Sequence, residues 1–320
     1  MSEEGVPAVP ESTEDVAWDL VRAAAELAES LDGEARSHTF AFRDGRLLAV
    51  NTSAIDAVLV WCPDRGWTSA IGPGDPRGQV LDLYLPLCSA TRRRPIAIGH
   101  LGQSLDGFIA TESGDSQFVT GHANVVHMHW LRGLCDAIVV GAGTVAADDP
   151  QLTTRHVPGP DPLRVIFDPS RRLSPRFRVF SDGAAPTLYV CLEEHVAGGE
   201  TQVGDAPVIG VPGDGPGGAP AALLRVLRDR GCARVFVEGG GVTVSAFLEA
   251  GLLDRLHLAV APVIIGGGRP AIRLQPPAQL RDCLRPSYRV FRMGGDVLFD
   301  CDLRSTAEPE PALSRISRVL

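Results

Sequence analysis

The spacing of apolar residues predicts a small mixed unit at the start of the chain. Behind a candidate N-cap at Ser12, apolar residues recur at helical spacing: Val16, Leu20, Ala23, Ala24, Leu27 and Leu31. Strand-like pieces follow at 38–42, 46–50 and 57–61, and a Gly/Pro turn region at 71–78 precedes an apolar run at 80–87. We therefore expect residues 1–93 to form a small N-terminal α+β unit without recognisable chemistry, beginning with a disordered stretch at 1–12.

From Pro95 onward, strand patterns alternate with helix patterns. Apolar runs predict strands at 96–101, 137–140, 163–168, 187–191, 207–211, 234–238 and 255–260. Helical spacing predicts helices at 121–134, 219–230 and 242–250, and strands at 288–292 and 296–302 are expected to form a hairpin around Gly294 and Gly295. This alternation is typical of an α/β domain with a mixed, mostly parallel sheet flanked by helices. The domain is assigned to residues 94–303, and residues 304–320 to a flexible tail.

Composition narrows the possible partners. The chain has 320 residues, of which 44% are hydrophobic and 22% charged, as in ordinary globular proteins. Its net charge of −9 argues against a nucleic-acid-binding surface and against a basic membrane patch. No signal-peptide pattern and no long apolar run occur, so we expect a cytoplasmic protein without a membrane span. The seven cysteines include no C-x-x-C pair, which fits a reducing compartment and gives no structural zinc site.

The most informative chemical pattern is V-E-G-G-G-V-T at 237–243. A β-branched strand ends in Glu238, three glycines follow, and a helical run begins. Glycines let backbone N–H groups approach an anion, and a helix start adds unpaired N–H groups at a positive dipole end. Taken alone, the pattern fits either a plain glycine turn or a phosphate site with the Glu238 carboxylate facing the ligand. The candidate anion-binding residues are Gly239, Gly240, Gly241, Val242 and Thr243.

A second strand-and-glycine pattern, at 139–145, adds to this interpretation. Gly141 and Gly143 precede Thr144 and suggest a second anion nest. Arg132 and Arg155 are candidate phosphate clamps, because guanidinium groups bind oxyanions through two parallel hydrogen bonds.

The strand at 163–168 has a basic end. Ser170, Arg171 and Arg172 follow it directly. A basic end on a strand of this kind is how many folds select the 2′-phosphate of NADP over NAD. The chain is therefore expected to prefer NADPH.

Two other polar groups leave alternatives open. Ser104 and Asp106 follow the strand at 96–101, where they either cap a local turn or line a ligand pocket. The helix at 121–134 carries three histidines, but His127 and His129 are two residues apart and face different sides of a helix. A metal site is not expected.

In combination, these segments resemble the reductase domain of riboflavin biosynthesis, the pyrimidine reductase that is often fused to a zinc deaminase. The resemblance covers residues 96–302, about two thirds of the chain, in family order and roughly family spacing. It is carried by S-L-D-G at 104–107, G-D-S at 114–116, T-G at 120–121, L-R at 131–132, D-A-I-V-V-G-A-G-T-V at 136–145, A-D-D-P-Q-L-T-T-R at 147–155, V-E-G-G-G at 237–241, G-L-L-D at 251–254 and A-P-V-I-I-G-G-G at 261–268.

The resemblance implies a dihydrofolate-reductase-like fold, NADPH as cofactor and a homodimer. It also implies the reaction, in which the ribosyl group of an aminopyrimidine 5′-phosphate is reduced to a ribityl chain. The family's nucleotide contacts fall on Gly102, Phe118, Thr144, Asp148, Pro169 and 240–246, with Phe118 where the family usually has Trp. Its substrate contacts fall on Ser116, Arg132, Leu152, Arg155 and Glu238.

The chain departs from the family pattern at three further positions. His100 stands where bacterial members commonly carry Lys, Asn124 stands where many have Arg, and Gln103 is closer to the fungal branch. His100 is a candidate for polarising the substrate or donating a proton. The proton donor is left open among Glu238, His100, Asp106 and a water.

Other functions remain as alternatives. The departures at His100 and Asn124 suggest a same-fold NADPH reductase that acts on a pterin- or flavin-like substrate. A non-catalytic, nucleotide-binding regulatory protein belongs to a different class. Dihydrofolate reductase itself is disfavoured, because Arg132 and Arg155 would have no phosphate to bind.

Overall fold

The computed structural model describes residues 13–72, 74–117 and 119–306. The chain divides into two compact units, Met1–Arg93 and Arg94–Leu320. The expected disordered stretch at 1–12 and most of the expected tail at 304–320 lie outside the described residues. Residues 304–306 belong to the last strand, β16 (Asp296–Thr306), which therefore runs past the predicted start of the tail.

The first unit is an antiparallel sheet with strand order β2-β1-β3-β4 and two helices, which confirms its α+β character. Its elements are α1 (Thr13–Leu31), β1 (His38–Arg43), β2 (Arg46–Val50), β3 (Ala57–Cys62), β4 (Gly66–Ser69) and α2 (Gly78–Cys88). The indole of Trp67 donates to the Ala24 carbonyl of α1 at 2.9 Å, and its ring lies edge-on to Phe40 and Trp61. These aromatic contacts join helix and sheet, and the sequence pattern did not indicate β4.

The second unit is built on a ten-stranded sheet. In sheet order its strands are β10 (Gln202–Val203), β11 (Ala206–Val211), β9 (Thr187–Leu192), β8 (Leu163–Phe167), β7 (Ala137–Gly141), β12 (Arg234–Glu238), β5 (Ile96–Ser104), β13 (Arg255–Ala261), β16 and β15 (Pro286–Met293). Every pair from β11 to β13 is parallel, and the outer pairs are antiparallel. The predicted mixed, mostly parallel sheet is confirmed, as is the terminal hairpin.

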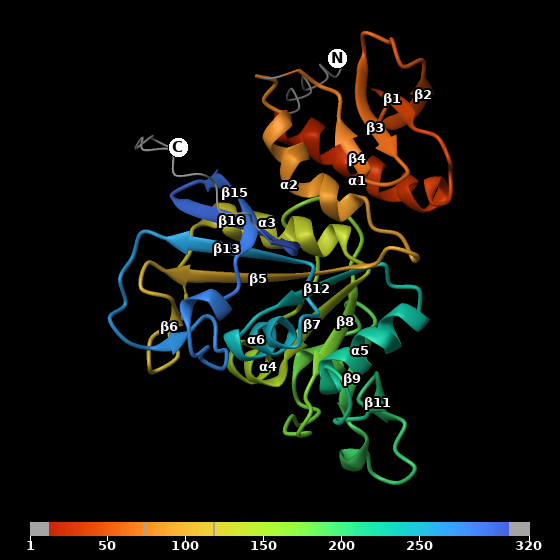
Figure 1. Ribbon diagram of the computed structural model, residues 1–320. Helices are drawn as coiled ribbons and strands as arrows, with labels where there is room; N and C mark the ends of the chain where they lie inside the picture. The colour runs from red at the N-terminus through yellow and green to blue at the C-terminus, as the bar shows by residue number, and fades with distance from the viewer. Residues whose placement is uncertain (1–12, 73, 118, 307–320) are drawn as a thin grey trace, which may run out of the picture. The chain divides into compact units, whose positions relative to one another are not determined.

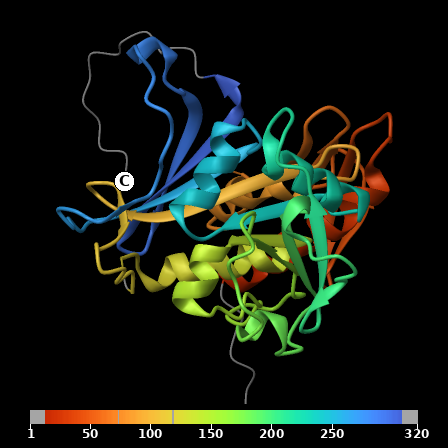
Figure 2. The same ribbon diagram turned by 90° about the horizontal axis from the view of Figure 1, so that it is seen from below.

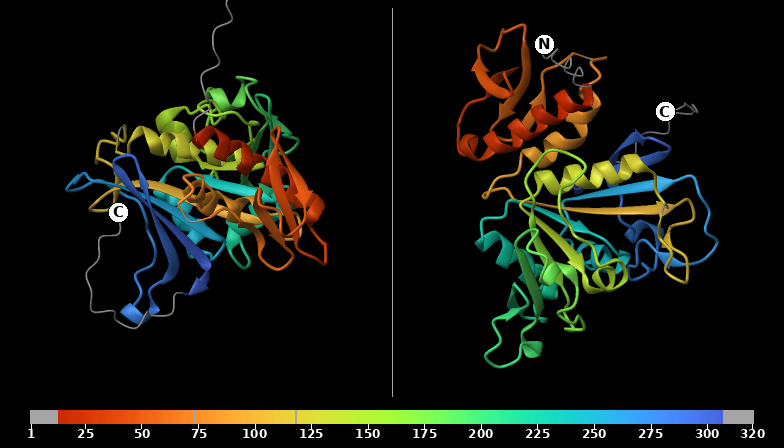
Figure 3. Two further views of the ribbon diagram at one scale, coloured as in Figure 1. Left: turned by 90° about the horizontal axis from the view of Figure 1, so that it is seen from above. Right: turned by 180° about the vertical axis from the view of Figure 1, so that it is seen from behind.

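Helices cover both faces of this sheet. α3 (His122–Leu134) lies on one face, and α5 (Gly218–Asp229) and α6 (Gly241–Glu249) lie on the other (Figures 1 and 3). Successive side chains of a strand point to opposite faces. Val235 and Val237 of β12 thus pack in the apolar core with α5 and α6, whereas Glu238 points to the α3 face, where it meets Arg132.

One predicted feature of the second unit differs. A short helix, α4 (Ala142–Asp148), begins directly after β7, where the sequence suggested a glycine nest. Gly141 is its N-cap with φ −75° and Gly143 lies inside it, so neither has the positive φ of a nest.

Smaller elements complete the second unit. A two-stranded ladder joins β6 (Phe108–Ala110) to β14 (Arg269–Pro270), and single helical turns are η1 (Arg178–Phe180), η2 (Glu193–His195) and η3 (Leu280–Asp282). The C-terminal hairpin, coloured blue, forms one edge of the large sheet (Figure 2). Among the described residues, no helix is long and apolar enough to cross a membrane.

Candidate functional site

The chain connections diverge between the neighbouring strands β7 and β12. After β7 the chain passes through α4 to β8 on one side, whereas after β12 it passes through α6 to β13 on the other side. Parallel α/β sheets bind ligands outside the carboxyl ends of their strands at such a switch point. β7 and β12 end together at Gly141 and Glu238, beside the middle of β5, which continues to Ser104. The two strand-and-glycine patterns therefore lie side by side at this edge.

Arg132 of α3 and Glu238 of β12 form a buried ion pair at this edge. Arg132 Nε donates to Glu238 Oε2 at 2.9 Å and Nη2 donates to Oε1 at 2.6 Å, while Nη1 donates to the Thr153 carbonyl at 3.1 Å. Their side chains are only 7% and 11% exposed. This corrects the expectation that the Glu238 carboxylate faces a ligand. Buried charges require partners, and the partner of the Glu238 carboxylate is the Arg132 guanidinium.

Arg155 lies next to this pair and has no carboxylate partner among the described residues. Its Nη1 donates to Thr153 Oγ1 at 2.6 Å, and the side chain is exposed. Partial desolvation, then the charges of Arg132 and Arg178, lower the pKa of Arg155. A cation in a positive environment attracts an anion, so Arg155 is better placed than Arg132 to bind a phosphate.

The loop that carries Arg155 is strained and is held from α3. Leu152 is buried with φ +59°, a left-handed conformation that costs energy for a branched side chain. The Arg155 backbone N–H donates to His129 Nδ1 at 3.0 Å, so the His129 ring must accept there and carry its proton on Nε2. Burial, followed by the charge of Arg132, lowers the pKa of His129 to about 3, which keeps it a neutral acceptor.

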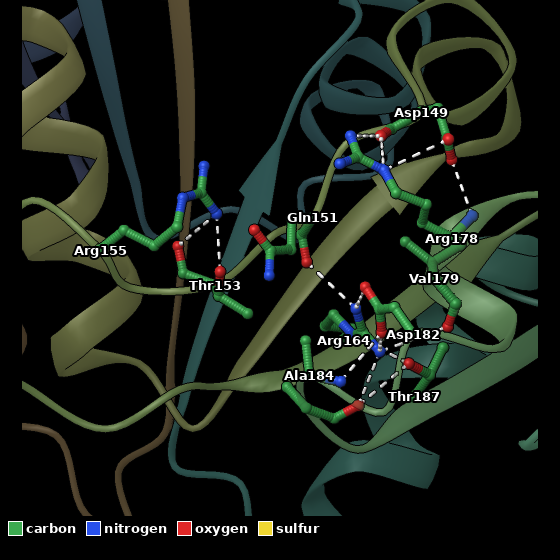
Figure 4. A network of polar contacts seen from close by, with 11 residues as sticks. Asp149, Gln151, Thr153, Arg155, Arg164, Arg178, Val179, Asp182, Ala184 and Thr187 are labelled. Atoms are coloured by element: carbon green, nitrogen blue, oxygen red, sulfur yellow. Dashed lines mark hydrogen bonds and ion pairs between the residues drawn. The ribbon is translucent and has the colours of Figure 1, made fainter.

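A second buried arginine anchors the other end of this loop (Figure 4). Arg164 is 1% exposed; it donates to the Gln151 carbonyl at 3.1 Å and to both Asp182 oxygens at 2.9 and 2.8 Å. The Arg178 backbone N–H donates to Asp149 Oδ1 at 2.8 Å. No local sequence pattern indicates Arg164, because its partners come from distant loops.

The three glycines after β12 have three different roles. Gly239 has φ +104°, and the Gly240 N–H donates to Thr144 Oγ1 at 2.9 Å. A Cβ on Gly241 would lie 2.2 Å from the Ala271 carbonyl oxygen, so this glycine permits a close backbone approach. The Thr243 N–H donates to the Gly240 carbonyl at 3.1 Å, so the N–H groups left for an anion at the start of α6 are those of Gly241 and Val242, and Val242 is 65% exposed.

Gly141 also allows two elements to pack closely together. A Cβ on Gly141 would lie 2.0 Å from Thr243 Oγ1, so α6 approaches the end of β7 only because Gly141 has no side chain. Thr144 and Thr243 thereby tie the starts of α4 and α6 together. This arrangement forms the floor of the candidate cofactor site.

Ser104 and Asp106 form a local turn, which is the first of the two alternatives that the sequence left open. Ser104 is fully buried and donates to Asp106 Oδ1 at 2.6 Å, and Asp106 accepts from the backbone N–H groups of Ile265 and Gly266 at 3.1 and 2.7 Å. The hydrogen bond from Ser104 is the main cause that lowers the pKa of Asp106 to about 2. Asp106 is therefore an ionised residue that holds the loop after β13, which argues against its role as a proton donor.

Two of the departures from the family pattern, His100 and Asn124, contact each other. His100 Nε2 and Asn124 Oδ1 are 2.9 Å apart, and Asn124 Nδ2 donates to Thr120 Oγ1 at 2.9 Å. Both residues are buried, and burial, followed by His257, lowers the pKa of His100 to about 3. His100 is thus neutral and enclosed, which argues against its role as an acid.

A buried histidine pair lies beside His100. His127 Nε2 is 3.0 Å from His257 Nδ1. His257 Nε2 is 3.2 Å from Asp300 Oδ1, an electrostatic contact without hydrogen-bond geometry. Burial lowers the pKa of both histidines. Within the described part of the chain, no three His, Cys, Asp or Glu residues are placed to hold a metal ion.

The basic end of β8 is partly occupied by internal contacts. Asp168 is buried and accepts from the Arg172 and Leu173 N–H groups at 2.6 and 2.9 Å, which forms the turn through Pro169 and Ser170. The Arg171 guanidinium pairs with Glu200. Arg172 is 69% exposed and lies 3.7 Å from Asp168, so Arg172 is the more available cation.

The remaining candidates have different surroundings. Gly102 packs against Thr120, where a Cβ would be 2.8 Å from Cγ2, and Ser116 is exposed on the loop after β6. Asp148 ends α4, and Phe118 lies outside the described residues.

Comparison with known proteins identifies relatives of this architecture. Residues 95–289 match the family described as the RibD C-terminal domain. The chain is 33% identical over 213 residues to the 2,5-diamino-6-ribosylamino-4(3H)-pyrimidinone 5′-phosphate reductase of Methanothermobacter thermautotrophicus, covering 65% of this chain and 97% of that protein. It is also 33% identical over 200 residues to the riboflavin biosynthesis protein RibD of Mycobacterium tuberculosis, covering 61% of this chain and 50% of that protein. The chain thus matches about half the length of the RibD relatives.

Solved structures show the same fold. The deaminase/reductase of Thermotoga maritima superposes with a TM-score of 0.57 at 20% identity, covering 90% of this chain and 99% of that chain. The riboflavin biosynthesis reductase of Saccharomyces cerevisiae gives a TM-score of 0.54 at 21% identity, covering 70% and 97%. Because the family match spans more than half of its 320 residues, the chain belongs to the RibD C-terminal domain family, with the dihydrofolate-reductase-like fold expected from the sequence.

Proposed function

We propose that this protein is an NADPH-dependent reductase that converts the ribosyl group of an aminopyrimidine 5′-phosphate to a ribityl chain. The observation that carries the proposal is the placement of two anion-binding features at one sheet edge. Arg155, beside the Arg132–Glu238 pair, offers a free cation on the α3 face, and the first turn of α6 offers backbone N–H groups next to it along β12. A phosphorylated substrate and a dinucleotide fit these two features.

The residues at the switch point fit a dinucleotide cofactor. Gly239, with its positive φ, and Gly240 form a floor without side chains beside Thr144, and the helix start above them is exposed at Val242. Gly102, Thr144, Asp148, Pro169 and the start of α6 would hold the cofactor. NADPH, when bound, supplies the hydride.

Residues of the protein itself orient the substrate. Glu238, fixed by Arg132, presents its carboxylate edge at the end of β12, and the strained Leu152 loop places Arg155 at the phosphate. His100 is enclosed and neutral, and Asp106 is ionised and bonded to backbone. We therefore assign Glu238 and Arg155 to substrate orientation, and the transferred proton to solvent water.

Among substrates, the undeaminated diaminopyrimidine is favoured. Two relatives that match through most of their own length, at 97% and 83%, have this compound in their names. The test compares NADPH consumption with the undeaminated and deaminated pyrimidine phosphates. Faster turnover of the undeaminated compound supports the assignment, and turnover of only the deaminated one contradicts it.

The pterin- or flavin-like alternative has less support. His100 and Asn124, which motivated it, are buried and bond to each other, so their change does not reshape the exposed part of the site. A regulatory protein would bind NADPH without consuming it in the presence of either pyrimidine phosphate. We further propose that the protein forms a homodimer and is located in the cytoplasm.

A further inference from the structure

The segment 266–271, which follows β13, is held by close backbone contacts on both sides. A Cβ on Gly268 would lie 2.1 Å from the Ala110 carbonyl oxygen, and a Cβ on Gly241 would lie 2.2 Å from the Ala271 carbonyl oxygen. The Ala271 N–H also donates to the Gly107 carbonyl at 2.9 Å. The backbone around Arg269 is therefore fixed between β6 and the first residue of α6.

Arg269 is an unassigned cation on this fixed segment. Its side chain is exposed, and no described residue forms a hydrogen bond or an ion pair with its guanidinium. The guanidinium lies against Gly114, where a Cβ would be 2.6 Å from Nη2 and where φ is +95°. Arg132 and Arg171, by contrast, already have carboxylate partners.

The surroundings of Arg269 belong to the cofactor side of the site. Its neighbours Pro270 and Ala271 touch Gly241 at the start of α6. Desolvation raises the pKa of Asp148, at the end of α4, and the charge of Arg269 opposes this rise. The substrate-phosphate candidates, in contrast, lie on α3 and on the loop that follows α4.

We propose that Arg269 binds the pyrophosphate of the dinucleotide cofactor, opposite the first turn of α6. The inference rests on the proposed function. The pyrophosphate is the anion that a helix start at a switch point binds, and Arg269 is the free cation whose own segment touches that helix start. Arg269 thus adds a guanidinium to the N–H groups of α6.

The test measures dissociation constants for both NADPH and NADH. Arg269→Ala is expected to weaken both cofactors by about tenfold, because the pyrophosphate is common to them and a charge-assisted contact is lost. The KM for the pyrimidine phosphate at saturating NADPH should stay within about twofold of wild type, since its phosphate is bound elsewhere. Arg269→Lys should keep part of the affinity. Arg281→Ala is the matched control, because it removes an exposed charge from η3, where Arg281 faces only Asp282.

Three results would overturn the inference. Unchanged affinity for both cofactors would leave Arg269 without a ligand, loss for NADPH alone would place it at the 2′-phosphate, and a rise in only the substrate KM would assign it to the substrate. If the wild-type protein bound neither cofactor, the proposed function would fail and this inference with it. Equal melting temperatures of the variants and wild type ensure that the fold is intact.

Discussion

The two faces of the large sheet are built in opposite ways. The face toward α5 and α6 is apolar, with the core residues Val139, Val165, Val235, Val237 and Phe247. The face toward α3 buries polar side chains among its apolar ones: His100, Asn124, His127, Arg132, Glu238, His257 and Asp300. The apolar face gives the fold most of its stability through burial, whereas the polar face depends on each partner being in place.

The difference follows the location of the site. Glu238 ends β12, whose three middle residues are apolar, and its side chain turns to the α3 face because residues alternate along a strand. α6 meets the same strand from the apolar face and contributes backbone groups. The cofactor is thus expected at a helix start supported by a dry core, and the substrate at a cluster of paired charges.

Breaking the Arg132–Glu238 pair should have the largest effect. Glu238→Gln leaves the Arg132 charge buried without a counter-ion, which typically costs about 3–5 kcal/mol of stability, and turnover should fall strongly as well. Chemical denaturation and steady-state kinetics on one preparation measure both. In the double variant Arg132→Met/Glu238→Gln the stability should largely return, because an apolar replacement removes the unpaired charge, whereas turnover should stay low.

The control for this prediction is an exposed pair. Asp56→Asn breaks the Arg43–Asp56 contact, whose side chains are 55% and 51% exposed, and should change stability far less because water screens it. If Glu238→Gln kept both full stability and full activity, the pair would carry neither role.

Acid should weaken the polar face first. Burial lowers the pKa of His100, His127, His129 and His257 in the folded state, with His100 and His129 at about 3. The unfolded chain binds protons on these residues below about pH 6.5, so stability is complete above that pH and falls as the pH decreases toward the folded values. Each histidine that stays neutral costs about 1.4 kcal/mol per pH unit in that window.

Unfolding free energies at pH 7.5 and 5.5 measure this loss. His127→Leu should make the pH dependence shallower by the share of one histidine. Leu227→Val, in the apolar core, is the matched control: it should lower stability equally at both pH values. A pH dependence that is unaltered by His127→Leu would contradict the assignment of the acid sensitivity to the polar face.

The same contrast explains what the sequence could predict. The apolar positions recur with a regular period, so the longer strands of the second unit and α3, α5 and α6 were predicted within a few residues. α4 was missed because its glycines suggested a turn, and β6, β10 and β14 because they are only two or three residues long. Local pattern alone does not indicate such short elements, which depend on tertiary pairing.

The site was predictable in composition but not in pairing. Arg132, Arg155 and Glu238 were all singled out, yet the Arg132–Glu238 pair joins residues 106 positions apart and leaves no local pattern. His129 was considered only as a metal ligand, and Arg164 was not considered. Arg269 follows the quoted glycine motif directly, and a free cation after three glycines was the available signal.

Replacing Arg155 tests whether the exposed part of the polar face binds the phosphate of the substrate. Arg155→Ala should raise the KM for the phosphorylated substrate at least about tenfold, because a charge-assisted contact contributes about 1.5–3 kcal/mol, while the dissociation constant for NADPH stays near that of wild type. The dephosphorylated nucleoside is the control substrate and should be insensitive to the variant. If wild type reduced the nucleoside as well as the phosphate, the phosphate contact at Arg155 would be excluded.

The smallest expected effect separates two adjacent arginines on the cofactor side. Arg171 is bound to Glu200 and its guanidinium lies 5.1 Å from the centre of the Tyr189 ring, whereas Arg172 is 69% exposed. Arg172→Ala should therefore reduce the preference for NADPH over NADH, by up to about tenfold, because an exposed arginine gains less from a phosphate than a buried one does. Arg171→Ala should instead lower the melting temperature and leave the ratio of the two dissociation constants unchanged, because its charge is already used within the protein. The ratio of dissociation constants, measured at low and at high salt, checks both variants. A ratio that collapses in Arg171→Ala and persists in Arg172→Ala would show that Arg171 leaves Glu200 to bind the cofactor, and the internal pair would then be a feature of the free protein alone.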